Sequence, residues 1–164
     1  MDLEWINHIS PQLATFLLAM LPIAELRASI PIALENFALP IWQAFGLSVL
    51  GAFVPAVFII YLIEPVSKYL IKHFKWAKKF FDWLFNRTRK RFAHKYDIWG
   101  SIALMIFVAI PLPVTGVWTG SLAAWLFGIE KRSAFLFIAL GAIISGVIVT
   151  LLTLGISNIF QYYG

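Results

Sequence analysis

Residues 66–97, VSKYLIKHFKWAKKFFDWLFNRTRKRFAHKYD, decide how this chain is organised. They hold ten of the thirteen Lys and Arg residues but only two acids, Asp82 and Asp97, and apolar stretches flank them on both sides. Loops on the cytoplasmic side of a membrane collect Lys and Arg because moving these charges across a bilayer is unfavourable. We therefore expect this stretch, the basic connector, to face the cytoplasm, and the rest of the topology can be counted outward from it.

The composition is typical of an integral membrane protein. The 164 residues are 61% hydrophobic and 13% charged, with a mean hydropathy of +0.85, which is far from the usage of soluble domains. Four uncharged stretches, residues 5–24, 36–63, 98–129 and 133–164, are each long enough to enter lipid. The net charge of +5 lies beside these segments, so we expect anionic lipid headgroups as partners, and no nucleic acid.

Several kinds of chemistry find no support in the sequence. The chain has no Cys, and its three His residues lack the spacing of metal ligands. It has no nucleophile–base set and no phosphate-binding loop, so we expect neither an enzyme nor a cofactor. The acidic start of the chain differs from a signal peptide, so we expect the first apolar stretch to be retained.

Two spans of similar design flank the connector. Residues 22–51 read PIAELRASIPIALENFALPIWQAFGLSVLG, and residues 111–141 read PLPVTGVWTGSLAAWLFGIEKRSAFLFIALG. Each half has an apolar run, a break with proline, a second apolar run, a polar loop and a long apolar helix, an order typical of transporter repeats. We therefore divide the chain into a first repeat (residues 1–64), the connector (65–97) and a second repeat (98–164).

The long helices at about residues 41–64 and 134–160 are predicted to span the membrane. The broken segments, about residues 8–34 and 98–129, allow two interpretations. As Pro-kinked spanning helices they would place Lys131 and Arg132 outside. As re-entrant hairpins they place twelve of the thirteen basic residues in the cytoplasm, the exception being Arg27, and both termini outside.

We favour the hairpins. The expected fold is thus an all-α integral membrane protein with an inverted repeat, in which each half is a re-entrant hairpin plus one transmembrane helix, in the inner (cytoplasmic) membrane of a cell. The prolines expected to break the hairpins are Pro22, Pro31, Pro111 and Pro113. The two tips, residues 22–27 and 111–116, should meet near the midplane, because broken backbone cannot face lipid. Shielding the hairpins from lipid favours a homo-oligomer, for example a dimer.

The connector itself is predicted to be one amphipathic helix at the membrane surface. Six apolar residues fall on one side of a helix and four lysines on the other. The apolar residues are Val66, Leu70, Phe74, Ala77, Phe81 and Leu84. Such a helix can bind anionic lipid or can serve only to fix the topology.

Two charges in the first break are the leading candidates for a site. Glu25 and Arg27 lie inside an otherwise apolar segment, and such charges usually mark a substrate path or a proton relay. Two residues apart on a regular helix they point in opposite directions, so they can meet only if the backbone is unwound. Arg27 is suited to bind an anionic substrate, and Glu25 is the candidate for proton coupling. Alternatively, both side chains reach toward the membrane surface.

The second break offers hydroxyls and glycine but no charge. Thr115, Gly116 and Thr119 could bind an anionic substrate together with free N–H groups at the start of a half-helix. Gly116 and Gly120 also form a GxxxG pattern, which more often indicates helix packing than ligand binding.

These two breaks resemble the small multidrug export protein family. The residues that carry the resemblance are LPIAELRASIP at positions 21–31 and PLPVTG at positions 111–116, with Gly120. At the level of architecture the family is similar to the DedA superfamily of lipid transporters. That resemblance implies re-entrant hairpins with inverted symmetry and proton-coupled movement of anionic lipid phosphates. DedA-like proteins carry acids and arginines in their hairpins; Glu25 and Arg27 match them, but the second tip has no Arg.

The function expected is therefore transport of an anionic amphiphile or lipid phosphate with proton coupling. Two alternatives stay open at this point. One is efflux of lipophilic cationic drugs, with Glu25 as the counter-charge. The other is a membrane scaffold that binds lipid through its connector and transports nothing.

Overall fold

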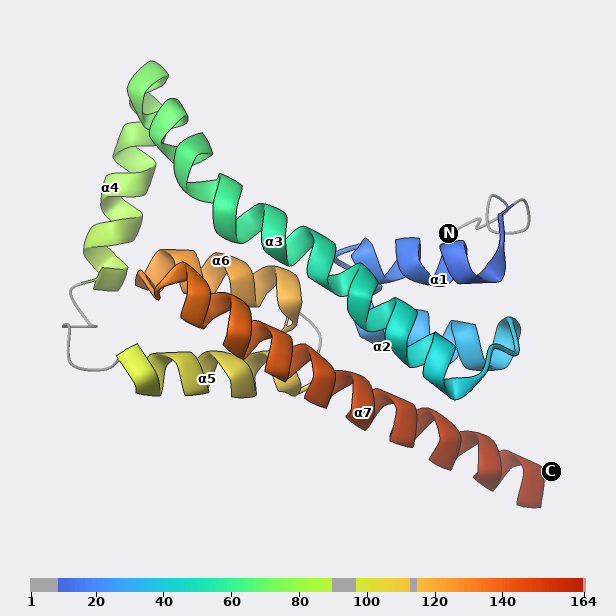
Figure 1. Cartoon of the computed structure of the whole chain (residues 1–164). Helices are drawn as coiled ribbons and strands as arrows, with labels where there is room; N and C mark the ends of the chain where they lie inside the picture. The colour runs from blue at the N-terminus through green and yellow to red at the C-terminus, as the bar shows by residue number, and fades with distance from the viewer. Residues whose placement is uncertain (1–8, 90–96, 113–114, 164) are drawn as a thin grey trace.

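The protein is built almost entirely of helices. The computed structural model describes residues 9–89, 97–112 and 115–163, and these ranges contain no strand. In chain order the elements are α1 (Pro11–Met20), α2 (Glu25–Pro31), the π-helix η2 (Ile32–Asn36), α3 (Ile41–His73), α4 (Lys75–Arg89), α5 (Asp97–Ala109), α6 (Val117–Phe127) and α7 (Lys131–Tyr163) (Figure 1). The predicted all-α class is confirmed.

Two long helices form the axis of the fold. Among the described residues, two helices are long and apolar enough to cross a membrane, Ile41–His73 and Lys131–Asn158. They contain the predicted span at about residues 41–64 and nearly all of the one at about 134–160, and they pack directly against one another (Figure 1). The other apolar helices, such as α5 and α6, are shorter and lie along this pair.

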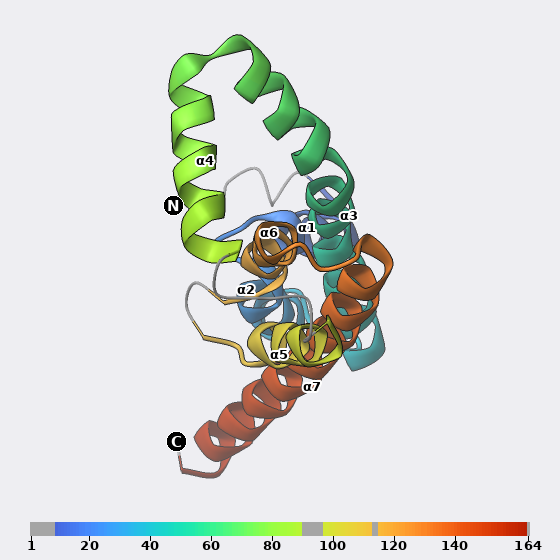
Figure 2. The ribbon, with the colours of Figure 1, turned by 90° about the vertical axis from the view of Figure 1, so that its left-hand side faces the viewer.

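The short helices form two pairs, each joined by a break in the helix. The chain reverses direction at residues 21–24 between α1 and α2, and again at residues 110–116 between α5 and α6 (Figures 1 and 2). The first helix of each pair packs on the long helix of its own half, α1 on α3 and α5 on α7. The second helix of each pair also packs on the long helix of the other half, α2 on α7 and α6 on α3. These breaks overlap the predicted tips, residues 22–27 and 111–116.

The connector differs from the single helix expected over residues 66–84. Helix α3 continues through Pro55 and Pro65 as far as His73, and the chain bends at Phe74, which has extended backbone. The bend allows α4 to fold back toward α6 (Figure 2), so that Ala77 is fully buried. Packing of α4 against α6 outweighs the tendency of the connector to form one continuous helix. The amphipathic pattern of the connector is therefore divided between the end of α3 and α4.

Pro31 also behaves differently from the expected hairpin break. It is the last residue of α2, and the helix continues beyond it as the π-helix η2. A proline inside a helix lacks the N–H that would bind the carbonyl of the fourth residue before it, and a wider turn can absorb this defect. The wider turn appears after the proline, where the N–H of Phe37 donates to the carbonyl of Ile32, five residues before it.

Glycines set the distance between the helices that pack within each half. A Cβ atom on Gly51 of α3 would overlap the carbonyl oxygen of Phe16 in α1 and would lie 2.9 Å from the Cβ of Ala19. On Gly141 of α7 it would lie 2.7 Å from the carbonyl oxygen of Met105 in α5. Backbone atoms cannot move aside as a flexible side chain can, so both contacts require glycine.

We therefore expect Gly51→Ala and Gly141→Ala to destabilise the protein by about 1–3 kcal/mol each, because the added methyl group forces two helices apart. The measurement is the free energy of unfolding of the purified protein in detergent. Gly46→Ala in α3 and Gly155→Ala in α7 are the matched controls, since nothing lies within 4 Å of a Cβ at either position. Equal losses at all four positions would contradict this account of the packing.

Candidate functional site

The two breaks contact one another, and the side chain of Arg27 joins them. Its guanidinium group donates to the carbonyl oxygens of Leu112 and Thr115, both in the break between α5 and α6. The side chain is 22% exposed. The sequence predicted contact between the two tips, and these hydrogen bonds confirm it.

The carboxylate of Glu25 binds the start of α6. Its Oε1 accepts a hydrogen bond of 3.2 Å from the backbone N–H of Trp118, the second residue of that helix. Its Oε2 lies 3.5 Å from the guanidinium group of Arg27, and the Glu25 side chain is only 5% exposed. The first N–H groups of a helix have no partner within the helix and carry partial positive charge. Glu25 therefore caps α6 from the other half of the chain.

Trp118 adds a second link between the halves. Its indole N–H donates to the carbonyl oxygen of Met20, the last residue of α1, at 3.0 Å. The end of one short helix is thereby tied to the start of another across the two tips. Some of the donors and acceptors freed by each break are thus bound by the opposite break.

Glu25 and Arg27 can meet because the backbone is distorted at Glu25. The φ angle of Glu25 is +42°, in the left-handed region that residues other than glycine rarely adopt. In a regular helix the two side chains would point in opposite directions. The pair was expected to form only where the backbone departs from a regular helix, and Glu25 provides that departure.

Gly116 makes room for the carboxylate. A Cβ atom at this position would overlap Glu25 Oε2 and would lie 2.7 Å from Glu25 Cδ. The φ angle of Gly116 is +135°, which side chains also disfavour. Of the pair in the GxxxG pattern, Gly116 therefore contacts the charged group, whereas Gly120 packs against Val108 of α5.

The two threonines use their hydroxyls within their own segment. Thr115 Oγ1 lies 2.7 Å from the carbonyl oxygens of both Ile110 and Leu112, and it accepts from the N–H of Leu112 at 3.1 Å. Thr119 Oγ1 donates to the carbonyl of Gly116 at 3.4 Å. Thr115 reaches Arg27 through its carbonyl instead. Binding of a substrate by either hydroxyl stays a prediction.

The predicted prolines take different places around this contact. Pro22 is exposed in the first break and Pro111 lies in the second, whereas Pro31 lies at the end of α2. Pro113 lies outside the described residues. Sequence reasoning missed Trp118, because its main contribution is a backbone N–H, a group that nearly every residue possesses.

Two buried hydroxyls, one of them on α2, have no hydrogen-bond partner among the described residues. They are Ser29 Oγ and Ser48 Oγ, and both residues are fully buried. Ser29 follows Glu25 by one helical turn on α2, which places both on one side of that helix. Within the part of the chain that the structure describes, no group of three His, Asp or Glu residues could hold a metal ion.

Gly116→Ala is expected to destabilise the protein by more than about 2 kcal/mol, because the methyl group would displace the carboxylate from α6 and strain the backbone. Gly128→Ala is the matched control, since Gly128 also has a positive φ, +75°, but nothing lies within 4 Å of a Cβ there. When Glu25 is already replaced by Ala, the further loss of unfolding free energy caused by Gly116→Ala should fall to about the loss caused by Gly128→Ala. The readout is the free energy of unfolding in detergent, and an undiminished cost in the double variant would disprove the contact.

The comparison with known protein families supports the resemblance seen in the two breaks. Residues 25–148 match the family described as "Putative small multi-drug export protein". The match starts at Glu25, within the first tip, and covers the second tip and the first half of α7. A search of curated proteins and a search of solved structures each found no match. The family and the two long apolar helices make this chain a membrane protein, and it belongs to the small multidrug export family.

Proposed function

We propose that this protein is a transporter that moves an anionic amphiphile, such as a lipid phosphate, across the bilayer together with a proton. The family description supports a transporter. The observation that carries the proposal is the position of the Glu25 carboxylate between the start of α6 and Arg27. These are the groups that proteins use to bind anions, a helix N-terminus and a guanidinium group, and here an internal anion occupies them.

The proposed mechanism is competition between Glu25 and the substrate anion. While Glu25 is ionised, its carboxylate holds the N–H of Trp118 and neutralises Arg27. A proton on Glu25 removes that charge, so its attraction to both groups weakens. An anionic headgroup can then take its place, and proton and anion are carried together. The unpaired hydroxyl of Ser29, one turn along α2, offers a polar group by which a proton could approach.

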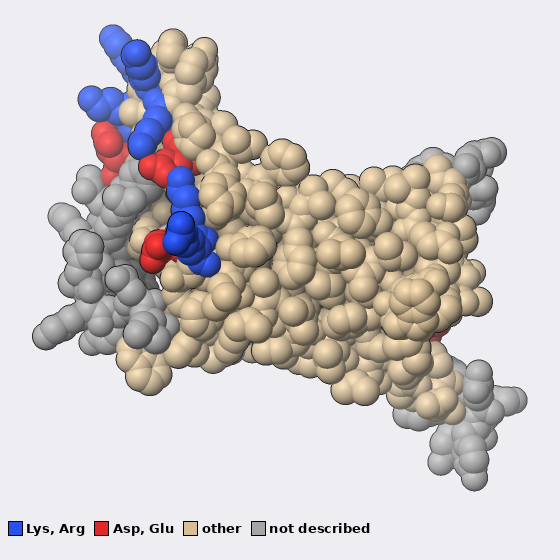
Figure 3. All heavy atoms as spheres, in the orientation of Figure 1, with Lys and Arg blue, Asp and Glu red and all other residues tan. Residues whose placement is uncertain are grey.

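We propose that the two halves form an inverted repeat with re-entrant hairpins. The equivalent packing of α1 on α3 and α5 on α7 supports this, as does the exchange of α2 and α6 between the long helices. So does the distribution of charge. On the face shown in Figure 3, the blue side chains of Lys and Arg gather at the end formed by α4, while the middle is uncharged. That end would face the cytoplasm and both termini the outside, in the inner membrane.

Efflux of a lipophilic cation is less well supported by this geometry. A cation would need a free carboxylate, but one oxygen of Glu25 accepts from Trp118 and the other lies beside Arg27. It would also have to approach Arg27, whose positive charge opposes it. We further propose that the protein forms a homo-oligomer, because α5 and α6 are too short to span a bilayer alone.

Transport should depend on both charges of the site. We expect proteoliposomes with wild-type protein to move a labelled polyprenyl phosphate or anionic phospholipid faster when a pH gradient is present. Arg27→Ala should lose at least tenfold in rate, because the anion loses its fixed counter-charge. Glu25→Gln, which resembles the protonated form, should still bind the anion but should not respond to the gradient.

Lys79→Gln is the control for this experiment, since Lys79 is exposed on α4, far along the chain from either tip. Wild-type rates in both Arg27→Ala and Glu25→Gln would remove the proposed mechanism. Transport of a lipophilic cation instead, with loss in Glu25→Gln, would establish drug efflux. Function that survives both substitutions but fails when the basic residues of the connector are removed would favour the scaffold.

The topology can be tested with single cysteines, because the natural chain has none. We expect Glu130→Cys and Lys79→Cys to react with an impermeant maleimide only from the cytoplasmic side, and Asn36→Cys only from outside. The Glu130 position decides the result. Kinked spanning helices would place it outside, whereas re-entrant hairpins place it on the same side as the connector. Labelling of Glu130→Cys in intact cells would contradict the hairpins.

A further inference from the structure

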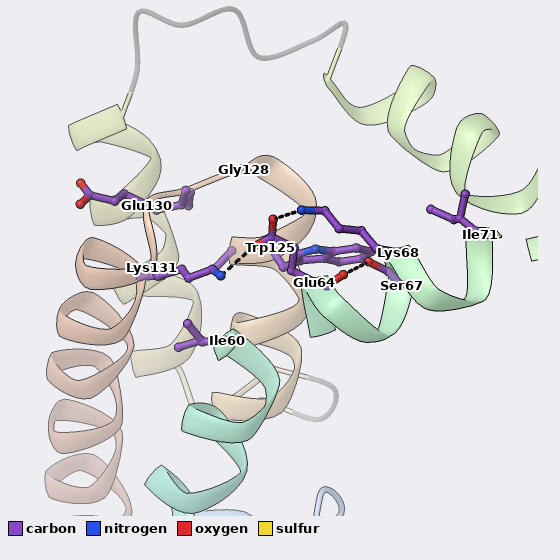
Figure 4. A pocket seen from close by; sticks show the side chains of 12 residues that line it. Ile60, Glu64, Ser67, Lys68, Ile71, Trp125, Gly128, Glu130 and Lys131 are labelled. Carbon is purple, nitrogen blue, oxygen red and sulfur yellow. Dashed lines mark hydrogen bonds and ion pairs between the residues drawn. The ribbon is translucent and has the colours of Figure 1, made fainter. Parts of the chain in front are cut away.

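A second polar site lies away from the two tips, at the end of the protein near α4. It is a pocket of about 530 Å³ between the end of α3, the end of α6 and the start of α7 (Figure 4). This volume is within the range of small-molecule sites. The pocket therefore lies between the two halves of the chain, at the end proposed to face the cytoplasm.

Three charged side chains from both halves meet at this pocket. Lys68 Nζ lies 2.8 Å from one oxygen of Glu64, and Lys131 Nζ lies 2.7 Å from the other. The fourth charged residue of the lining, Glu130, points its side chain away from them (Figure 4). Two ammonium groups thus share one carboxylate, which leaves a net positive charge at the mouth of the pocket.

The lysines keep the capacity to bind another anion. Each ammonium group has three N–H donors, and the contact with Glu64 accounts for one of them. The side chains of Lys68 and Lys131 are 72% and 44% exposed, so the free donors face outward. An arriving phosphate could therefore bind both lysines without the loss of a buried contact.

Most of the remaining lining of the pocket is apolar. Its lining includes Ile60, Ile71, Trp125, Ile129 and Ala134. Ile60 and Ala134 belong to the core and are 4% and 1% exposed. Trp125 is in edge-to-face contact with Phe81 of α4, with ring centroids 5.9 Å apart. A positively charged mouth above an apolar wall matches a ligand with an anionic head and a hydrocarbon tail.

We infer that this pocket binds the phosphate headgroup of an anionic lipid of the cytoplasmic leaflet between Lys68 and Lys131, with the start of its acyl chain against Ile60 and Ile129. The inference rests on the topology given under the proposed function, because the anionic leaflet must face this end. It does not require transport. A lipid held here contacts α3 and α7 at once, and so it stabilises the arrangement of the two halves seen in the structure.

The test is binding of phosphatidylglycerol to the purified protein in detergent, measured by native mass spectrometry. We expect Lys68→Gln/Lys131→Gln to bind about 25-fold more weakly, because each basic residue near a lipid surface contributes about a fivefold factor. Lys72→Gln/Arg132→Gln is the matched control. It removes the same charge from neighbouring exposed positions that do not line the pocket, and it should stay within about threefold of wild type. Glu64→Gln should bind more tightly than wild type, since it removes the competing carboxylate.

Further measurements distinguish lipid binding in this pocket from binding elsewhere on the protein. Equal losses in the two double variants would show diffuse attraction to a basic surface and would overturn the inference. Equal binding of phosphatidylcholine would overturn it as well, and displacement by inorganic phosphate at equal concentration would identify a free phosphate site instead of a lipid site. Arg27→Ala should keep the binding although it loses transport, so the two proposals can fail separately.

Discussion

The structure depends on one requirement, that backbone groups freed by a broken helix must find partners where water is scarce. Each break leaves carbonyl and N–H groups unpaired, and lipid offers none in return. The protein meets the requirement by placing the two breaks against one another. Arg27 binds two carbonyls of the second break, and Glu25 binds the N–H of Trp118. Each break thus supplies hydrogen-bond partners to the other.

The contact between the two breaks places backbone strain and close packing at a few positions. Glu25 holds a left-handed backbone that costs an ordinary residue about 1–2 kcal/mol. Position 116 requires glycine for two reasons, its positive φ angle and the close contact with the Glu25 carboxylate. Elsewhere the packing is repetitive, since Gly51 and Gly141 perform the same task for the two long helices. Local strain that the surroundings maintain is characteristic of functional sites, and here it coincides with the charged pair.

The sequence predicted the helices, the breaks and the meeting of the tips because these follow from hydropathy and proline. The 3.6-residue pattern of the connector could not reveal the bend at Phe74, since a pattern continues through a bend when both parts have an apolar face. Nor could proline alone locate the breaks, because α3 runs through Pro65 and the helix continues beyond Pro31 as η2. The role of Trp118 and the pocket around Glu64 could not be predicted either, because both depend on tertiary contacts. Glu25 and Trp118 are 93 positions apart in the sequence, and Glu64 and Lys131 are 67 positions apart.

The absence of charge in the second tip follows from the same contact. If the two tips were equivalent, each would carry a carboxylate and a guanidinium group. Two arginines would then lie close together with too few carbonyl and carboxylate oxygens to accept their hydrogen bonds. In this protein the first tip supplies the charged side chains, and the second tip supplies backbone carbonyls and the start of α6. The two tips are therefore complementary, whereas the helices of the two halves pack in similar ways. One carboxylate then links both halves, because it caps α6 and faces Arg27 at the same time. A proton on Glu25 would weaken both contacts together, because a neutral carboxyl group attracts an N–H and a guanidinium group less strongly than a carboxylate does.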